Sequence, residues 1–176
     1  SIVWRLDCHS RQRVTLVLPE AKRMATPGDI PGVPFLRARN FTTGNRLLVK
    51  WVIIHTAETG ETPNAAEALM KWCSGPDAPH ASWHYAVDAD SVTQSVLERD
   101  IAWHAPGANR FGIGIEHAGR ASQKESGWVD AYSQAMLDRS ARLVSELCAR
   151  WSIPVLRITS DELIAGAKGI CGHADV

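Results

Sequence analysis

Residues Leu47–Glu58, LLVKWVIIHTAE, decide the fold, because an apolar run of strand length ends there in a histidine. The run is continuous and rich in branched side chains, which predicts a central strand covered on both faces. His55 then places a polar imidazole at the mouth of that strand, where it needs a partner. For a lone histidine, a core residue bonded to a backbone carbonyl is the commoner explanation, so its company elsewhere in the chain matters.

The segments after this strand alternate between helix and strand patterns. A helix is expected after Thr62-Pro63, with Thr62 as its N-cap, and Gly75-Pro76 should end it. Next come a hairpin with its turn at 89–91, a strand, a long helix from about Asp130 to Trp151, and a short helix opened by a capping box and ended by Gly169. The patterns for these elements are WHYAVD with VTQSVL (83–97), FGIGIEHA (111–118), a stripe through Met136, Leu143 and Leu147, and Thr159–Glu162. This order predicts an α/β fold with a central mixed β-sheet flanked by helices.

Residues 1–46 have a different pattern. They hold two short strand-like runs (2–6 and 14–18), followed by PGDIPGVP (27–34), which interrupts regular structure repeatedly. We expect residues 1–46 to be an irregular N-terminal extension or linker that wraps the domain or joins it to a neighbour. Residues 47–176 form the predicted domain.

Composition narrows the classes of function. The 176 residues carry 19 basic and 19 acidic side chains, so the formal net charge is zero and bulk attraction to nucleic acid or an anionic membrane is not expected. The sequence shows neither an apolar stretch long enough for membrane insertion nor a signal-peptide start. The four cysteines form no CxxC pair, which excludes a zinc ribbon. Buried thiols are the simpler expectation, with a Cys148–Cys171 disulfide as the alternative.

Two distant histidines suggest a metal site. His173 follows Gly172 near the far end of the sequence from His55, and catalytic zinc sites commonly combine such distant histidines while one position stays open for water. Asp175 could accept a hydrogen bond from an imidazole or simply cap the local backbone.

Glu116 is the candidate general base, because it ends an otherwise apolar strand. Gly112 and Gly114 share its face, which would let a ligand lie against the sheet. A structural salt bridge with an arginine is the alternative. His104 could bind substrate or stabilise an oxyanion, or it could order its own loop with Asn109. His9, His80 and His117 have no supporting pattern and are expected at the surface or in packing roles.

Four motifs in order, IIHTAE, SWHYAVDAD, IAWHAPGANRFGIGIEHAG and GHADV, resemble the zinc-dependent type-2 N-acetylmuramoyl-L-alanine amidases, which include bacteriophage endolysins and peptidoglycan recognition proteins. The resemblance covers about Leu47–Val176. It implies hydrolysis of the amide bond between N-acetylmuramic acid and L-alanine, with Zn²⁺ as cofactor and His55 and His173 as its first two ligands. The family's third ligand, Asp or Cys, lies beyond the GHxD motif, so we expect this domain to be truncated at its C-terminal end.

The resemblance also implies roles for the remaining site residues. Glu116 falls where some members place their catalytic acid, and His104 and Asn109 would orient the substrate. Many phage members use a tyrosine where this chain has Trp83, and an indole cannot exchange a proton, so Trp83 is expected to contact substrate only. Tyr85, predicted to lie on the same face as Trp83, is a poorer substitute for that tyrosine.

The partner implied is peptidoglycan, bound by a monomer or by one domain of a multidomain lysin. We expect a role in phage-mediated lysis, with the protein in the host cytoplasm until it reaches the cell wall; an autolysin would instead act in the cell wall or periplasm. The alternative function is a non-catalytic peptidoglycan-binding domain of the same fold, because non-catalytic members typically lose a zinc ligand. An unrelated zinc hydrolase or a metal-free α/β binding domain is a third hypothesis.

Overall fold

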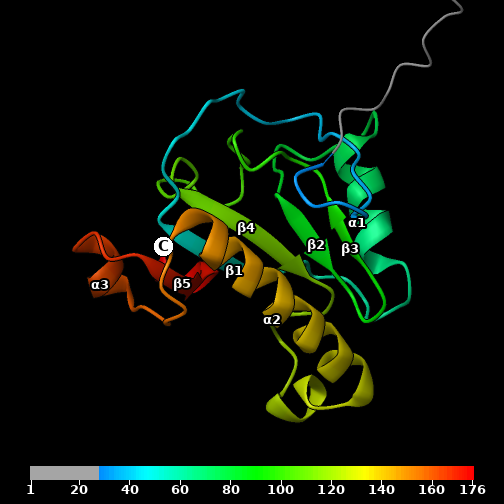
Figure 1. The fold of residues 1–176 in the computed structure, drawn as a ribbon. Helices are drawn as coiled ribbons and strands as arrows, with labels where there is room; N and C mark the ends of the chain where they lie inside the picture. Colours follow the sequence, from blue (N-terminus) through cyan, green and yellow to red (C-terminus); the bar gives the residue numbers. More distant parts are fainter. Residues whose placement is uncertain (1–27) are drawn as a thin grey trace, which may run out of the picture.

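Five strands form one mixed sheet in the order β3-β2-β4-β1-β5 (Figure 1). The structure is a computed structural model that describes residues 28–176, so the strand-like runs predicted at 2–6 and 14–18 lie outside it. Strands β1, β2, β4 and β5 are mutually parallel where they pair, whereas β2 and β3 form an antiparallel hairpin. The elements in chain order are β1 (Trp51–Thr56), α1 (Ala65–Ser74), β2 (Tyr85–Val87), β3 (Val92–Gln94), β4 (Gly112–His117), the 3-10 helix η1 (Glu125–Trp128), α2 (Ala131–Trp151), α3 (Ser160–Ile164), β5 (Gly169–Gly172) and the 3-10 turn η2 (His173–Asp175). The predicted α/β fold with a mixed sheet is confirmed.

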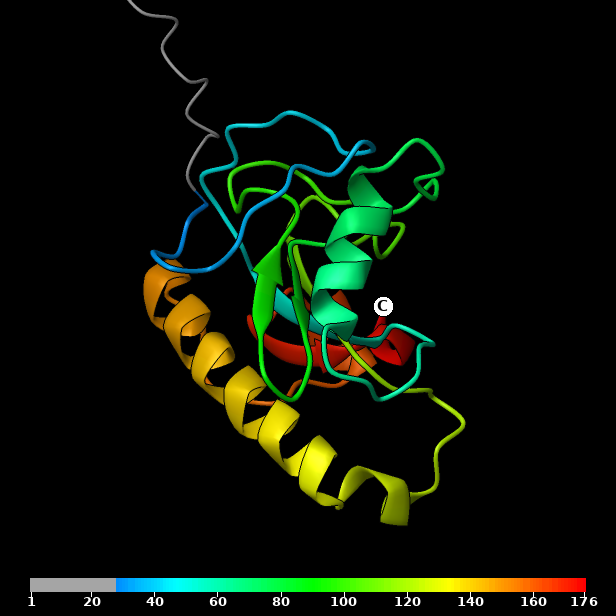
Figure 2. The same ribbon diagram turned by 90° about the vertical axis from the view of Figure 1, so that its right-hand side faces the viewer.

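The two faces of the sheet are covered differently. Helix α2 crosses one face, and its buried stripe, including Met136 and Leu147, packs on side chains such as Ile113 and Ile115 of β4. Helix α1 covers the β2–β3 half of the other face (Figure 2). Over β1, that second face is covered by the loop before β4, through Ala105 and Ala108. The predicted core stripe of the long helix is confirmed.

Helix boundaries agree with the sequence patterns except at two points. Asp130 caps α2 by accepting a hydrogen bond from the Ser133 backbone N–H, and the predicted capping box opens α3. Thr62 is not the N-cap of α1, because that helix begins only at Ala65. Gly169 does not end α3; it begins β5, five residues after the helix stops at Ile164.

Helix α1 takes its cap from elsewhere in the fold. Its N-cap residue, Asn64, has a left-handed backbone (φ 67°) and makes no side-chain cap. Instead, Oδ2 of Asp88 accepts a buried hydrogen bond from the Ala66 N–H at 2.9 Å. Oδ1 of Asp88 accepts the N–H groups of Asp90 and Ser91 and so orders the hairpin turn. A long-range carboxylate thus replaces the local cap that the Thr-Pro pair predicted.

Residues 28–46 lie along the hairpin and the segment that follows it. Backbone N–H groups of Leu36 and Ala38 donate to the carbonyls of Gln94 and Ser95, and Thr42 pairs with Ile101. Residues 28–46 therefore pack against the hairpin and the segment after it, and their assignment to an extension separate from the domain stays a prediction.

The buried thiols were predicted correctly for the described cysteines. Cys73, Cys148 and Cys171 are free and buried, so the alternative Cys148–Cys171 disulfide is not formed. Within residues 28–176, no helix is both long and apolar enough to cross a membrane.

Candidate active site

The carboxyl ends of β1, β4 and β5 meet at one edge of the sheet. His55 lies in β1 beside Glu116 of β4, which is its partner in the strand register, and His173 directly follows β5. Parallel strands bring their carboxyl ends to the same edge, so residues far apart in sequence become neighbours there. A cavity of about 590 Å³ opens at this edge. Its lining consists of Ile54, His55, Thr56, Glu58, His104, Glu116, Ala121, Gly172, His173 and Ala174.

Three imidazoles converge in this cavity. Nδ1 of His55 lies 3.0 Å from Nδ1 of His173, and Nε2 of His55 lies 3.0 Å from Nδ1 of His104. Burial, and then the neighbouring His104 and His173, lower the pKa of His55 to about 3. His55 is therefore neutral at physiological pH, as a metal ligand must be.

The arrangement of His55 and His173 fits a zinc ion in part. Two nitrogens bound to one tetrahedral zinc at about 2.0–2.1 Å would lie roughly 3.3 Å apart, close to the 3.0 Å between the two Nδ1 atoms. Imidazole nitrogen is also a ligand that zinc accepts readily. Across residues 28–176, however, no third His, Cys, Asp or Glu completes a group able to hold a metal. The described residues thus supply two convergent ligands.

Glu116 is half-buried, and its carboxyl has no compensating partner among residues 28–176. Its Oε2 atom is inaccessible and makes no hydrogen bond. Burial, and to a smaller extent the nearby Glu58, raise the pKa of Glu116 to about 7. The alternative of a salt bridge is not realised, since none of the ion pairs among residues 28–176 includes Glu116. A carboxyl with this pKa can both accept and release a proton near neutral pH.

His104 reaches the cavity because its loop is ordered from within. Oδ1 of Asn109 accepts the backbone N–H groups of His104 and Ala105 at 2.9 and 2.7 Å. The loop that carries His104 is therefore ordered by the side chain of Asn109, which is not part of the cavity lining. Burial lowers the pKa of His104 to about 4, and its Nε2 is buried without a partner.

The glycines on the Glu116 face do not leave space for a ligand, contrary to the prediction. The His104 ring fills the space above Gly114, where an added Cβ would lie 2.5 Å from the ring's Cγ. Above Gly112, an added Cβ would lie 2.6 Å from Cδ1 of Ile53. Gly114 thus serves to seat a histidine of the cavity rather than a substrate.

The structure does not bring Trp83 to the cavity. Its side chain is buried with Leu69 and Cys73 beneath α1. Tyr85 packs on the opposite side of the sheet with the residues of α2, and its hydroxyl donates to Glu98 at 2.6 Å. The predicted shared face of Trp83 and Tyr85 is therefore wrong. Strand β2 begins only at Tyr85, so strand alternation does not extend back to Trp83.

Several site residues were not singled out from the sequence. Glu58 lines the cavity with a left-handed backbone (φ 54°), and its Oε1 accepts hydrogen bonds from the Thr56 hydroxyl and the Ala121 N–H. His117 is buried, as a packing role predicts, and its Nδ1 lies 3.1 Å from the His55 carbonyl oxygen. Strand alternation places the side chains of His117 and Glu116 on opposite faces of the sheet. The sequence pattern therefore did not indicate the contact between His117 and the backbone of β1.

Asp175 acts as a backbone cap. Its Oδ2 accepts the Gly172 N–H at 2.9 Å, which orders the turn carrying His173. Of the two expectations for Asp175, the structure shows this one. His80 is exposed, as predicted, and His9 lies outside the described residues.

Comparisons with known proteins agree with this arrangement. Residues 44–176 match the family model described as N-acetylmuramoyl-L-alanine amidase. N-acetylmuramoyl-L-alanine amidase A of Achromobacter lyticus is 38% identical over 101 residues, which are 56% of this chain and 51% of that protein. The chain therefore spans about half the length of this curated relative.

Solved structures show the same fold at low sequence identity. The hydrolase AmiA of Staphylococcus aureus, solved with its ligand, has a TM-score of 0.61 and 14% identity over 83% of this chain and 67% of its own. A selenomethionine derivative of AmpD has a TM-score of 0.57 and 18% identity over 83% of each chain. PlyL has a TM-score of 0.53 and 16% identity over 80% of each chain.

Proposed function

The chain belongs to the N-acetylmuramoyl-L-alanine amidase family, and we propose that it hydrolyses the amide bond between N-acetylmuramic acid and L-alanine in peptidoglycan. The observation that carries this proposal is the half-buried carboxyl of Glu116, whose Oε2 makes no hydrogen bond, beside the convergent His55 and His173. Amide hydrolysis needs a proton carrier close to groups that can hold a metal ion, and here the Glu116 carboxyl lies beside two convergent imidazoles.

Zn²⁺ is the proposed cofactor, held by Nδ1 of His55 and Nδ1 of His173. When bound, it supplies a Lewis acid that polarises the scissile carbonyl and acidifies a water molecule. Both histidines are positioned by backbone contacts, His55 through its carbonyl and His117, and His173 through the turn that Asp175 caps.

Glu116 has the proton-transfer role in this proposal. With a pKa of about 7, its carboxyl takes a proton from the attacking water and passes it to the leaving amine of L-alanine. His104 is neutral at the same pH and lines the cavity beside His55, so its ring can contact a bound substrate. We propose that His104 orients substrate in this way, while Asn109 acts indirectly by holding the His104 loop.

The test is digestion of purified cell-wall sacculi by the wild-type chain and by Glu116→Gln. We expect the wild type to expose new L-alanine amino termini and Glu116→Gln to lose this release by about 10²-fold or more. Glu146→Gln, on the solvent-facing side of α2, is the matched control and should retain activity. Equal release by wild type and Glu116→Gln would refute the role of Glu116.

The alternative, a peptidoglycan-binding domain without catalysis, gives a different result in the same experiment. Such a domain would sediment with sacculi yet expose no amino termini at any zinc concentration. Zinc content, measured after dialysis of wild type and His55→Ala, tests the cofactor separately. Roles in phage-mediated lysis and as a monomer stay predictions from the sequence.

A further inference from the structure

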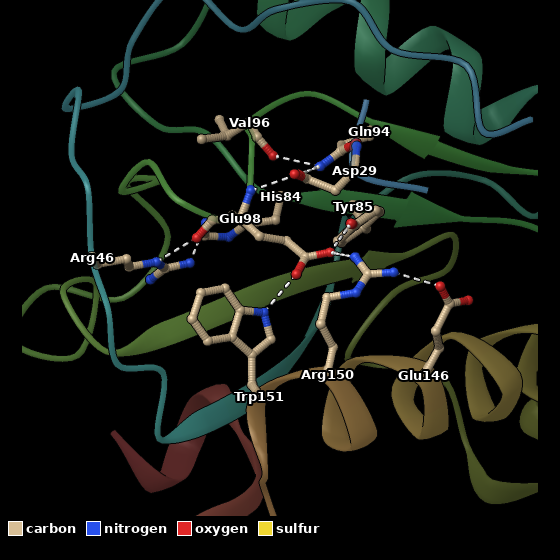
Figure 3. A network of polar contacts seen from close by, with 10 residues as sticks. All are labelled: Asp29, Arg46, His84, Tyr85, Gln94, Val96, Glu98, Glu146, Arg150 and Trp151. Atoms are coloured by element: carbon tan, nitrogen blue, oxygen red, sulfur yellow. Dashed lines mark hydrogen bonds and ion pairs between the residues drawn. The ribbon is translucent and has the colours of Figure 1, made fainter. Parts of the chain in front are cut away.

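The segment from Glu98 to Gly112 carries His104, and one arginine, Arg46, binds both of its ends. Arg46 donates from Nε to the Glu98 carbonyl at 2.6 Å and from Nη1 to the Gly112 carbonyl at 2.8 Å. Nη1 also lies within hydrogen-bonding distance of the carbonyls of Asn109 (3.3 Å) and Arg110 (3.5 Å). The two ends of the segment are therefore held by a single guanidinium, whose contact with the Glu98 carbonyl is drawn in Figure 3.

Arg46 also contacts the wall against which His104 packs. Its Nη2 lies 2.8 Å from Nε2 of His84, and Nδ1 of His84 accepts the Gly114 N–H at 3.1 Å. The His104 ring sits on Gly114 and meets the His84 ring edge-on, with 5.7 Å between centroids. Arg46 thus touches both the segment that carries His104 and the residue beside its ring.

The Arg46 guanidinium binds backbone carbonyls instead of a carboxylate. Among residues 28–176, none of the ion pairs includes Arg46, although the carboxylate of Glu98 is close by. That carboxylate is bound instead by Tyr85, Arg150 and Trp151 (Figure 3). Burial lowers the pKa of Arg46 to about 10, so it remains charged at neutral pH. The N–H donors of Arg46 point at backbone carbonyls. These hydrogen bonds fix the geometry of the segment and do not pair opposite charges.

We infer that Arg46 is a positioning residue that keeps the Glu98–Gly112 segment closed, so that His104 stays beside His55 in the cavity. The inference rests on the proposed function for its effect on catalysis, but the position of the His104 ring is a property of the chain itself. Lysine cannot replace Arg46 fully, because one ammonium cannot reach carbonyls at both ends of the segment.

Arg150 provides the matched control. It belongs to the same polar network, but it contacts the segment only through the side-chain carboxylate of Glu98, and it does not bind the Glu98 or Gly112 carbonyl that Arg46 holds. Arg46→Gln and Arg150→Gln should therefore both lower the melting temperature, whereas only Arg46→Gln should move His104.

The experiment has a structural and a kinetic readout. In the metal-free protein, ¹H–¹³C correlation spectra of the histidine rings should show the His104 signal shifted or broadened in Arg46→Gln and unchanged in Arg150→Gln. In sacculus digestion, Arg46→Gln should lower kcat at least about tenfold while KM stays within about twofold, and Arg46→Lys should recover part of the loss.

An unchanged His104 signal in either folded Arg46 variant would overturn the inference, and so would an equal shift in Arg150→Gln. If Arg46→Gln does not fold, Arg46→Lys carries the same comparison. If the wild type releases no amino termini, the proposed function fails, yet the spectra still decide the role of Arg46.

Discussion

Replacing Gly114 by alanine tests the site most directly, because this glycine has no backbone reason to be glycine. It lies within β4, outside the positive-φ residues, so alanine can adopt its conformation. The added Cβ would lie 2.5 Å from Cγ of His104 and within 2.8 Å of two further ring atoms. To reach ordinary van der Waals contact, the ring must withdraw by about 1 Å or the strand must shift. Overpacking of this kind costs about 1–3 kcal/mol of stability.

The displacement of His104 should weaken catalysis more than stability. A misplacement of about 1 Å can cost on the order of 10²-fold in rate, so kcat of Gly114→Ala in sacculus digestion should fall by about that factor. Gly169→Ala in β5 is the control, since its added Cβ also meets close neighbours, Cγ2 of Ile158 at 2.6 Å and the Leu156 carbonyl oxygen at 2.7 Å, but these lie outside the segment that carries His104. It should lose comparable stability and keep most activity. Wild-type kcat in Gly114→Ala, or an equal loss in Gly169→Ala, would refute the argument that Gly114 seats His104.

Three further predictions concern the polar groups around the cavity. Folding raises the pKa of Glu116 from 4.5 to about 7, so the contribution of Glu116 to the stability of the metal-free protein should fall by up to about 3 kcal/mol as the pH rises from about 4.5 to 7. The lowered pKa values of His55 and His104 give a slope of the opposite sign in both proteins, so urea titrations at pH 5 and 8 should show the Glu116 effect as the difference between wild type and Glu116→Gln. Asn109→Ala leaves two backbone N–H groups without their acceptor and should cost about 1–3 kcal/mol, with faster amide exchange at His104 and Ala105, whereas Asn109→Asp should behave like the wild type. Glu98→Gln weakens the hydrogen bonds that the Glu98 carboxylate accepts from Tyr85, Arg150 and Trp151 and should cost about 1–3 kcal/mol in chemical denaturation; a change below measurement error would show that the network does not stabilise the fold.

Helices and strands whose positions depend on their own residues were predictable from the sequence. The β1 run, the stripe of α2 and the capping box of α3 each depend on residues within the element, and each is found where expected. The start of α1 depends on Asp88, a residue of the hairpin, and no local pattern could show that a distant carboxylate would cap this helix. Sequence reasoning therefore placed elements well and their long-range caps poorly.

The residues of the site also differ in whether a local sequence pattern indicates them. The sequence indicated His55, Glu116 and His173 as candidates because each lies at the end of an apolar strand, and the parallel strands place the three close together. Trp83 was misplaced because it precedes its strand, where alternation no longer fixes a face. Arg46 gave no signal at all, since its partners are main-chain carbonyls, which every sequence contains.

The two faces of the sheet have different roles, which explains why β4 can carry residues of the site without weakening the hydrophobic core. On the α2 face, β4 presents Ile113 and Ile115 to a continuous apolar cluster. On the other face, the same strand presents Gly112, Gly114 and Glu116, and its missing side-chain volume is filled by Ile53 and His104. A strand of period two can therefore stabilise the domain with one set of residues and seat the site with the other. It follows that substitutions of Ile113 or Ile115 should act through stability, whereas substitutions of Gly114 should act through the position of His104.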